Sequence, residues 1–175
     1  MNKIELGWLP EKVIVRVVGK GCFINSRNFK EALMKLLEGN YDEIIIDLCD
    51  CKGMDSTFIG VLTGITLKNL KKRQKHIVLA NISKTNRELL DTLGVLRFFE
   101  IDEEPSTFET NFESVIDTPE DPDDAISQIK HILEAHENLM KADEKNVERF
   151  KTVQQALEHD LADKIERKKK TEPKE

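Results

Sequence analysis

An unbroken run of isoleucines followed by a helix-start signal constrains the fold of this chain more than any other feature. Residues 43–48 read Glu-Ile-Ile-Ile-Asp-Leu, and a short run rich in β-branched residues is typical of a strand buried on both faces. Asp55-Ser56-Thr57 follows, and from Ser56 onward apolar residues recur at helical spacing. A doubly buried strand that leads into a helix predicts an α/β sheet with helices packed on it.

Segments of the same two kinds flank this pair. Their order, ββαβαβα(β), implies a mixed sheet, because the first two strands follow each other directly and the later strands alternate with helices. The expected elements are strands at 3–8, 12–18 and 76–82, a helix that Asn25 or Ser26 caps and Gly39 ends, a short helix from Ser83 to Gly94, and a last short strand within 95–101.

The composition changes after residue 101. Residues 102–122 are acidic and contain three prolines, which predicts a connector, and four apolar side chains leave open that part of it docks on the domain: Phe108, Phe112, Val115 and Ile116. From 123 to 170 there is neither Gly nor Pro, and the sequence favours helix throughout. We therefore divide the chain into a domain at 1–101, the connector at 102–122, a helical extension at 123–170 and a disordered tail at 171–175.

The extension carries an imperfect heptad, which His136, Asp143 and Gln154 interrupt. A single helix of roughly 45 residues would be about 70 Å long, too long to bury its apolar stripe on a small domain. We expect it either to fold back as a hairpin, bending near 141–145, or to pair with another chain; an isolated solvated helix is the alternative. The expected oligomerisation residues are Ile126, Ile129, Leu133, Met140, Val147, Phe150, Leu157 and Leu161.

Composition excludes several classes of function. A net charge of −6 argues against a nucleic-acid binder, and the basic run 167–170 is read as a solvated helix C-terminus. No apolar stretch reaches the roughly 20 residues that cross a bilayer, and the N-terminus lacks the pattern of a signal peptide. We expect a soluble cytoplasmic protein without membrane insertion. The three cysteines fit a reducing compartment, and Cys49 and Cys51 are read as buried thiols at a strand end rather than as metal ligands.

The sequence shows no enzymatic pattern. None of the histidines (76, 131, 136 and 159) lies in a nucleophile–base arrangement. His131 and His136 are five residues apart, so they share a helix face too poorly for a metal pair. Gly19-Lys20-Gly21 is too short for a phosphate-binding loop. We therefore expect no catalytic residues, no cofactor and no metal.

The junction at residues 55–57 is the candidate functional site. It places two hydroxyls beside the free backbone N–H groups of a helix N-terminus. Those groups and the helix dipole favour negative charge, so a phosphate on Ser56 would be stabilised there. The alternative is that Ser56 is an ordinary N-cap, and Asp47 is expected only to end a strand.

The strand order together with Asp47…Met54-Asp55-Ser56-Thr57-x-Ile59-Gly60-Val61-Leu62 resembles the STAS family, which includes the bacterial anti-sigma factor antagonists. The resemblance covers residues 3–101. In antagonists of this family the serine after the aspartate is phosphorylated by a partner that is both kinase and anti-sigma factor. The resemblance implies phosphorylation at Ser56, with Thr57 as second candidate, and a phosphate that blocks partner docking.

The chain departs from the family pattern at two places. Phe58 stands where many antagonists carry Gly, and the loop at 19–24 lacks an acidic residue. Phe23, Ile24 and Phe58 are expected to form an apolar partner patch, with an inward Phe58 as the alternative. The expected partner-binding residues are Asp55, Ser56, Thr57, Phe58, Phe23 and Ile24.

Three functions compete. The first is a non-enzymatic signalling protein, similar to anti-sigma factor antagonists, that binds a serine kinase or anti-sigma factor under control of Ser56 phosphorylation. The second is a STAS scaffold or adaptor in a signalling or transporter complex, assembled through its C-terminal helices without a switch. The third, a nucleotide-binding STAS protein, lacks a visible phosphate loop.

Overall fold

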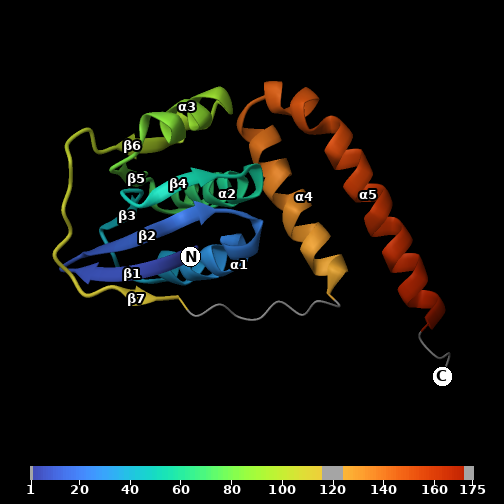
Figure 1. The fold of residues 1–175 in the computed structure, drawn as a ribbon, viewed down its shortest axis with the longest axis horizontal. Coiled ribbons are helices and arrows are strands. Elements are labelled where there is room, and N and C mark those ends of the chain that lie inside the picture. The colour runs from blue at the N-terminus through green and yellow to red at the C-terminus, as the bar shows by residue number, and fades with distance from the viewer. Residues whose placement is uncertain (1, 116–123, 172–175) are drawn as a thin grey trace.

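One mixed β-sheet forms the centre of the molecule (Figure 1). The computed structural model describes residues 2–115 and 124–171. The sheet order is β6-β5-β3-β2-β1-β7, with β4 paired to the end of β2; β1 is antiparallel to both its neighbours, and the other pairs are parallel. The strands are β1 (Lys3–Leu9), β2 (Lys12–Gly21), β3 (Glu43–Asp47), β4 (Cys51–Met54), β5 (Ile77–Ala80), β6 (Phe99–Ile101) and β7 (Glu113–Ser114).

The helices follow the sequence signals closely, with one shift. The helices are α1 (Phe23–Glu38), α2 (Ser56–Arg73), α3 (Lys84–Thr92), the 3-10 turn η1 (Leu96–Phe98), α4 (Ala125–Ala142) and α5 (Lys145–Thr171). The predicted start of α1 at Asn25 or Ser26 is wrong. The helix begins at Phe23, because the side chain of Asn25 accepts a hydrogen bond from the backbone N–H of Cys22 at 2.8 Å and closes the first turn from inside the helix.

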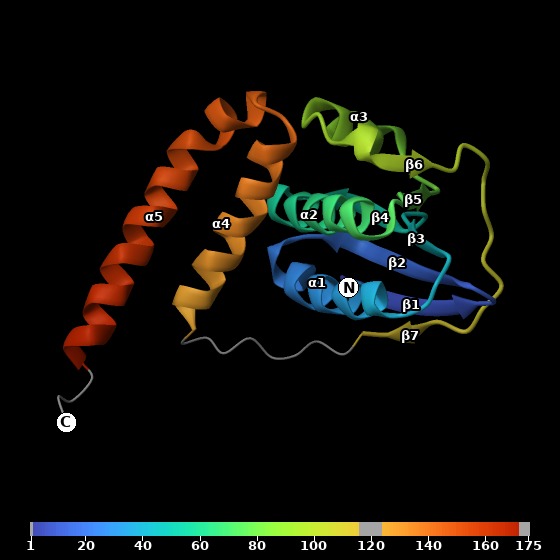
Figure 2. The ribbon, with the colours of Figure 1, turned by 180° about the vertical axis from the view of Figure 1, so that it is seen from behind.

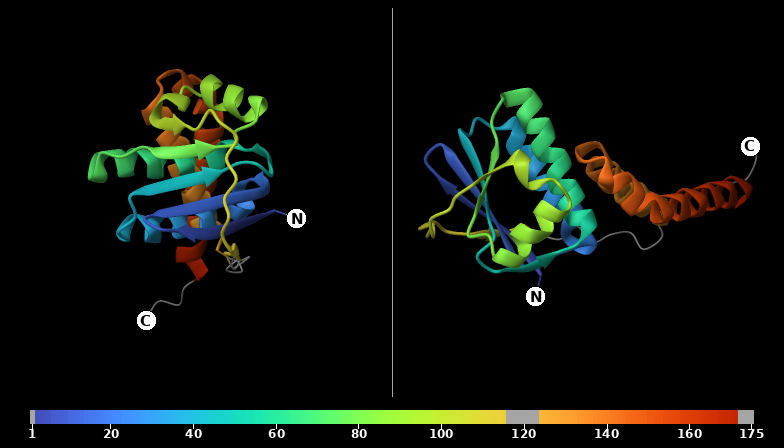
Figure 3. Two further views of the ribbon diagram at one scale, coloured as in Figure 1. Left: turned by 90° about the vertical axis from the view of Figure 1, so that its left-hand side faces the viewer. Right: turned by 90° about the horizontal axis from the view of Figure 1, so that it is seen from above.

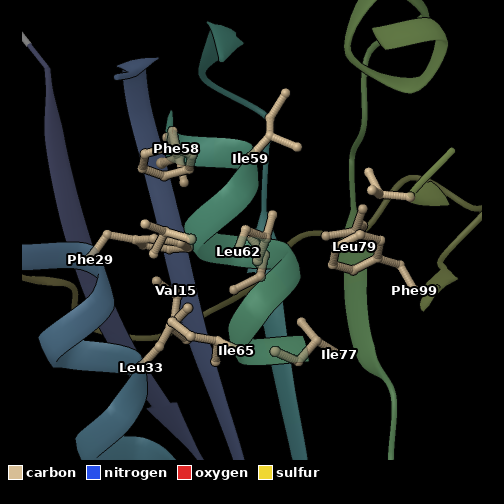
Figure 4. Packing of buried hydrophobic residues seen from close by; sticks show 14 of the residues in the cluster. Val15, Phe29, Leu33, Phe58, Ile59, Leu62, Ile65, Ile77, Leu79 and Phe99 are labelled. Carbon is tan, nitrogen blue, oxygen red and sulfur yellow. The ribbon is translucent and has the colours of Figure 1, made fainter. Parts of the chain in front are cut away.

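The isoleucines of β3 explain why both faces of the sheet are covered. Ile44 and Ile46 point into the main core beneath α1 and α2, whereas Ile45 points to the opposite face. All three are buried, which confirms the prediction of a strand with two covered faces. Figure 4 shows the main core, where side chains of α1 and α2 meet those of β2 and β5.

The segment after β6 covers the second face. Phe108 and Phe112 pack against the cluster around Ile45, and the guanidinium of Arg16 lies 3.8 Å from the centre of the Phe112 ring. Val115 packs against the main core from the end of β7. Part of the acidic segment therefore docks on the sheet, as its aromatic residues suggested, while Ile116 and the rest of 116–122 lie outside the described residues.

The helical extension divides into α4 and α5 at residues 143–144, within the interval where a bend is expected. The two helices pack on each other, and α4 also packs along α2. Figures 2 and 3 show α4 as a further layer on the helical side of the domain, with α5 outermost. Helix α5 extends through Thr171, and 172–175 lie outside the described residues.

The region around the cysteines differs from the prediction. Residues 51–54 form the short strand β4, which the sequence did not reveal because Cys-Lys-Gly-Met carries no β-branched residue. Cys51 is buried at its start, but Cys49 is exposed, so the interpretation of both as buried thiols is wrong for Cys49.

Asp47 does more than end β3. Its carboxylate is fully buried, accepts a hydrogen bond from Asn81 at 2.8 Å and pairs with Arg16 at 2.8 Å. These contacts join three segments at the carboxyl end of the parallel strands. Among residues 2–115 and 124–171, no helix is long and apolar enough to cross a bilayer.

Candidate functional site

Asp55 joins the starts of two helices. Its Oδ1 accepts a hydrogen bond from the N–H of Phe58 in the first turn of α2, and its Oδ2 accepts one from the N–H of Phe23, the first residue of α1, both at 2.8 Å. The N–H of Asp55 in turn donates to the carbonyl of Gly21. A carboxylate between two helix N-termini is stabilised by both dipoles, so Asp55 fixes the geometry of this corner.

Asp55 is the N-cap of α2, so Ser56 is not. The alternative that treated Ser56 as an ordinary cap is therefore wrong. Ser56 is the first residue of the helix, it is half-buried, and its hydroxyl lies 3.1 Å from Nε2 of His136 in α4. The candidate modification site is thus in contact with the C-terminal extension.

His136 is neutral and tightly enclosed. Its side chain stacks on Phe150 of α5 with 4.7 Å between ring centres, and burial lowers its pKa, partly offset by the charge of Asp55. Within the described residues Nδ1 has no hydrogen-bond partner. Because orphaned buried N–H groups are rarer than acceptors without a partner, we assign the proton to Nε2, which then donates to the hydroxyl of Ser56.

A second hydroxyl–imidazole pair lies beside the first. The Oγ of Ser26 in α1 is 2.8 Å from Nε2 of His131. Burial, followed by the charges of Lys30 and Arg27, lowers the pKa of His131 to about 4, so this imidazole is neutral as well. Because the two histidines are five residues apart, they lie on different sides of α4, and His131 contacts α1 whereas His136 contacts α2. Sequence reasoning missed both contacts.

The Ser56–His136 pair differs from a nucleophile–base arrangement at one point. A nucleophilic serine needs a base whose second nitrogen is oriented by a third group. Nδ1 of His136 lacks such a group among the described residues. Nor does any cluster of three His, Cys, Asp or Glu able to hold a metal occur in the described ranges. The arrangement offers a hydroxyl at a helix N-terminus, covered by a neutral imidazole.

The expected apolar patch is only partly present. Phe58 is fully buried and stacks on Phe29 at 4.3 Å between ring centres (Figure 4). The inward alternative therefore holds, and Gly21 makes room for it, because a Cβ there would overlap the Phe58 ring. Phe23 is half-buried against His131, whereas Ile24 is 74% exposed.

The remaining site residues differ in access. Asp55 is exposed, and Thr57 is buried, so the side chain of Thr57 is less accessible than that of half-buried Ser56. Ile129, Leu133 and Phe150 of the heptad are buried within this one chain, whereas Val147 is 45% exposed; the other members, Ile126, Met140, Leu157 and Leu161, are half-buried. The buried members serve the fold of the single chain, and oligomerisation through the others stays a prediction.

Two glycines let α4 lie close to α2. A Cβ on Gly60 would overlap the backbone of Ala135, and a Cβ on Gly64 would overlap the side chain of Asn138. The amide of Asn138 also donates to the carbonyl of Gly60 at 3.2 Å. Ala135 is completely buried by this contact. Gly60, Gly64 and Ser56 lie at four-residue intervals, so they share one face of α2.

Polar contacts at the end of α4 hold it to the domain. The amide of Asn146 donates to the carbonyls of Leu93 and Leu139 at 2.9 and 2.8 Å. Arg97 bonds the carbonyl of Ala142 and pairs with Asp143. The α4–α5 corner is therefore attached next to α3 and η1.

Comparison with solved structures agrees with this fold. A putative anti-sigma factor antagonist from Thermotoga maritima superposes with a TM-score of 0.51 at 20% identity, over 59% of this chain and 86% of that one. Unphosphorylated SpoIIAA, an anti-sigma factor antagonist, gives 0.48 at 19% identity over 58% and 88%. SpoIIAA of Bacillus in its phosphorylated form gives 0.47 at 20% identity over 58% and 92%.

The search of curated proteins found no match to the chain. The family comparison is decisive instead, because the profile of the STAS domain matches residues 4–111, from β1 to the segment before β7. Helices α4 and α5 lie outside the matched region. With well over half of its residues covered by this match, the chain belongs to the STAS domain family.

Proposed function

We propose that this protein is a non-enzymatic cytoplasmic signalling protein of bacterial type that binds a protein partner under control of phosphorylation at Ser56. The partner is a serine kinase that also acts as an anti-sigma factor, and the protein acts as its antagonist in transcription regulation. The likeness in fold to a putative anti-sigma factor antagonist supports the choice of partner class.

One observation carries the proposal. Asp55 alone provides the side-chain cap of α2, which leaves the hydroxyl of Ser56 outside the capping hydrogen bonds while it stays at the positive end of an 18-residue helix. A phosphate there adds a charge of nearly −2 beside free backbone N–H groups. The same charge is costly against a desolvated partner surface, so modification opposes docking.

The test starts with the protein isolated from its own cells. Intact mass and phosphosite mapping are expected to show one phosphate on Ser56. Affinity purification with the Ser56→Ala chain as bait should retain a serine kinase, and Ser56→Asp should lose it. Ser114→Asp, a matched change at an exposed serine of β7, should behave like wild type. An unmodified Ser56 together with unchanged binding by Ser56→Asp would refute the switch.

A second candidate function is a scaffold assembled through the C-terminal helices. It is favoured by α5, which forms the outermost layer (Figure 3) and exposes Val153 at 41% beside half-buried Leu157 and Leu161. Light scattering of the full chain is expected to show self-association that Leu157→Glu abolishes and Gln155→Glu does not. A monomeric wild-type chain would exclude self-assembly of this kind.

A further inference from the structure

We propose that the face of α2 carrying Ser56, Gly60 and Gly64 is a helix-accepting surface, that α4 is its internal occupant, and that a protein partner reaches Ser56 by replacing α4 with a helix of its own. The role of Ser56 in this inference rests on the proposed function. The inference of a helix-accepting surface rests only on how α4 packs against α2. Neither α4 nor its contact with α2 belongs to the region that matches the family.

The two glycines shape the surface for a helix. Glycine lowers the stability of a helix interior, and at both positions the missing Cβ is replaced by part of α4. Their four-residue spacing continues the line from Ser56 along one side of α2. The resulting shallow groove admits the helix backbone at Ala135, and Ala135 itself is completely buried, which leaves no open space for a larger side chain.

The seam between α4 and the domain is not completely filled. It contains a cavity of about 100 Å³ whose lining includes Lys30, Val61, Gly64 and Ala135. Nδ1 of His136 lies in the seam with no hydrogen-bond partner within the described residues. Buried polar groups without partners and unfilled space both reduce the stability of a contact. A helix held in this way is easier to exchange than one of the core elements.

Phosphorylation and a docked helix exclude each other at Ser56. Nε2 of His136 is 3.1 Å from the hydroxyl, and the ring is 4% exposed beneath Phe150. A phosphate attached to this oxygen needs the space that the imidazole fills. It would also place nearly two negative charges against a buried neutral ring and beside Asp55. A partner helix docked at this position would meet the same phosphate in the same space. This gives a physical reason why modification would block docking.

The experiment supplies α4 in trans to the full chain. Because Ala135 is completely buried, the arginine of Ala135→Arg has no room there, so the chain's own α4 is expected to be released while the face of α2 keeps its native residues. The probe is a fluorescein-labelled peptide of residues 124–144, and binding is followed by anisotropy. We expect it to bind Ala135→Arg at least about tenfold more tightly than wild type, because the internal helix competes in the latter. Glu137→Arg, an equal insertion at an exposed position of α4, should behave like wild type.

Two double variants locate the binding. Gly60→Leu added to Ala135→Arg fills the groove and should abolish peptide binding. Ser56→Asp added to Ala135→Arg should weaken it at least about tenfold. Equal peptide binding with and without Gly60→Leu, or no binding to Ala135→Arg, would overturn the helix-accepting surface. Unchanged binding with Ser56→Asp would overturn its link to Ser56.

Hydrogen exchange shows whether the domain of Ala135→Arg is still folded. Ala135→Arg should lose protection in 125–142 and keep it in β2 and β3. If the strands also lose protection, Asn138→Arg, placed over Gly64, takes its place with the same expected and contrary outcomes. These readouts need no kinase. A failed peptide experiment therefore removes the helix-accepting surface and leaves phosphorylation intact, whereas an unmodified Ser56 in cells removes the proposed function and leaves the surface.

Discussion

The hydroxyl of Ser56 lies 3.1 Å from Nε2 of His136, although the two residues are 80 positions apart in the chain. This contact joins the candidate modification site of the STAS domain to the helical extension. We propose on this basis that modification of Ser56, partner docking and the position of α4 are one coupled equilibrium.

A methyl group on Gly60 should weaken the docking of α4. Gly60→Ala improves the helix propensity of α2 by about 1 kcal/mol, but the overlap with the backbone of Ala135 is expected to cost more, with a net loss of roughly 1 kcal/mol in the free energy of unfolding. Gly53→Ala is the matched control, because no atom lies within 4 Å of the added Cβ. Urea denaturation measures both; equal stability of the two variants would contradict the close packing.

Acidification should release α4. The pKa values of His131 and His136 are lowered in the docked state, so below the unperturbed value of about 6.5 the released helix takes up protons that the docked helix does not. Docking is therefore fully favoured above about pH 6.5 and is progressively lost toward about 4, the docked pKa of His131. The positive charges of Lys30 and Arg27 lower the pKa of His131 further, whereas the charge of Glu134 raises it. The charge of Asp55 raises the pKa of His136.

Hydrogen exchange of α4 between pH 7 and pH 5, corrected for intrinsic rates, measures this effect. His131→Gln should flatten the profile, whereas His159→Gln, on the exposed side of α5, should not. A pH-independent protection of α4 would contradict the neutral, buried histidines.

Loss of the Asp55 carboxylate should loosen two helices at once. Asp55→Ala removes the acceptors of the Phe58 and Phe23 N–H groups, and removal of a cap typically costs about 1 kcal/mol, up to about 2. Asp55→Asn keeps one of the two acceptor oxygens, so its loss of stability should be smaller than that of Asp55→Ala. Asp50→Ala, at an exposed carboxylate nearby, should cost little. Thermal or urea unfolding tests this order, and an Asp55→Ala chain as stable as wild type would disprove the shared cap.

Cys49 should react slowly despite its exposure. Partial burial of its sulfur, followed by the charge of Asp47, raises its pKa to about 12, so the thiolate that reacts with alkylating agents is scarce at pH 8. Mass spectrometry after brief iodoacetamide treatment should find Cys49 much less modified in the folded chain than in urea. Equal labelling in both states would contradict the raised pKa.

The sequence predicts the α/β sheet with packed helices and the start of α2 well because both depend on local signals, and the resemblance to the STAS family adds the fold family. The run of three isoleucines at 44–46 indicates a strand buried on both faces, and the start of α2 follows from its capping residue. Strand β4 was missed since it exists only through pairing with β2. The contact of His136 with Ser56 was missed because it depends on how α4 docks. The sequence does carry one signal of this contact. Gly60 lowers the stability of α2, and a close neighbour that fills the space of the missing side chain accounts for a glycine there.

The most direct test of the account is hydrogen exchange on the full chain with phosphoserine installed at position 56. We predict that 125–142 loses protection relative to the unmodified chain, while β2 and β3 keep theirs. Phosphoserine installed at position 114 should leave all of these segments unchanged. If α4 stays as protected with the phosphate on Ser56 as without it, the claim that Ser56 and α4 form one switch is wrong.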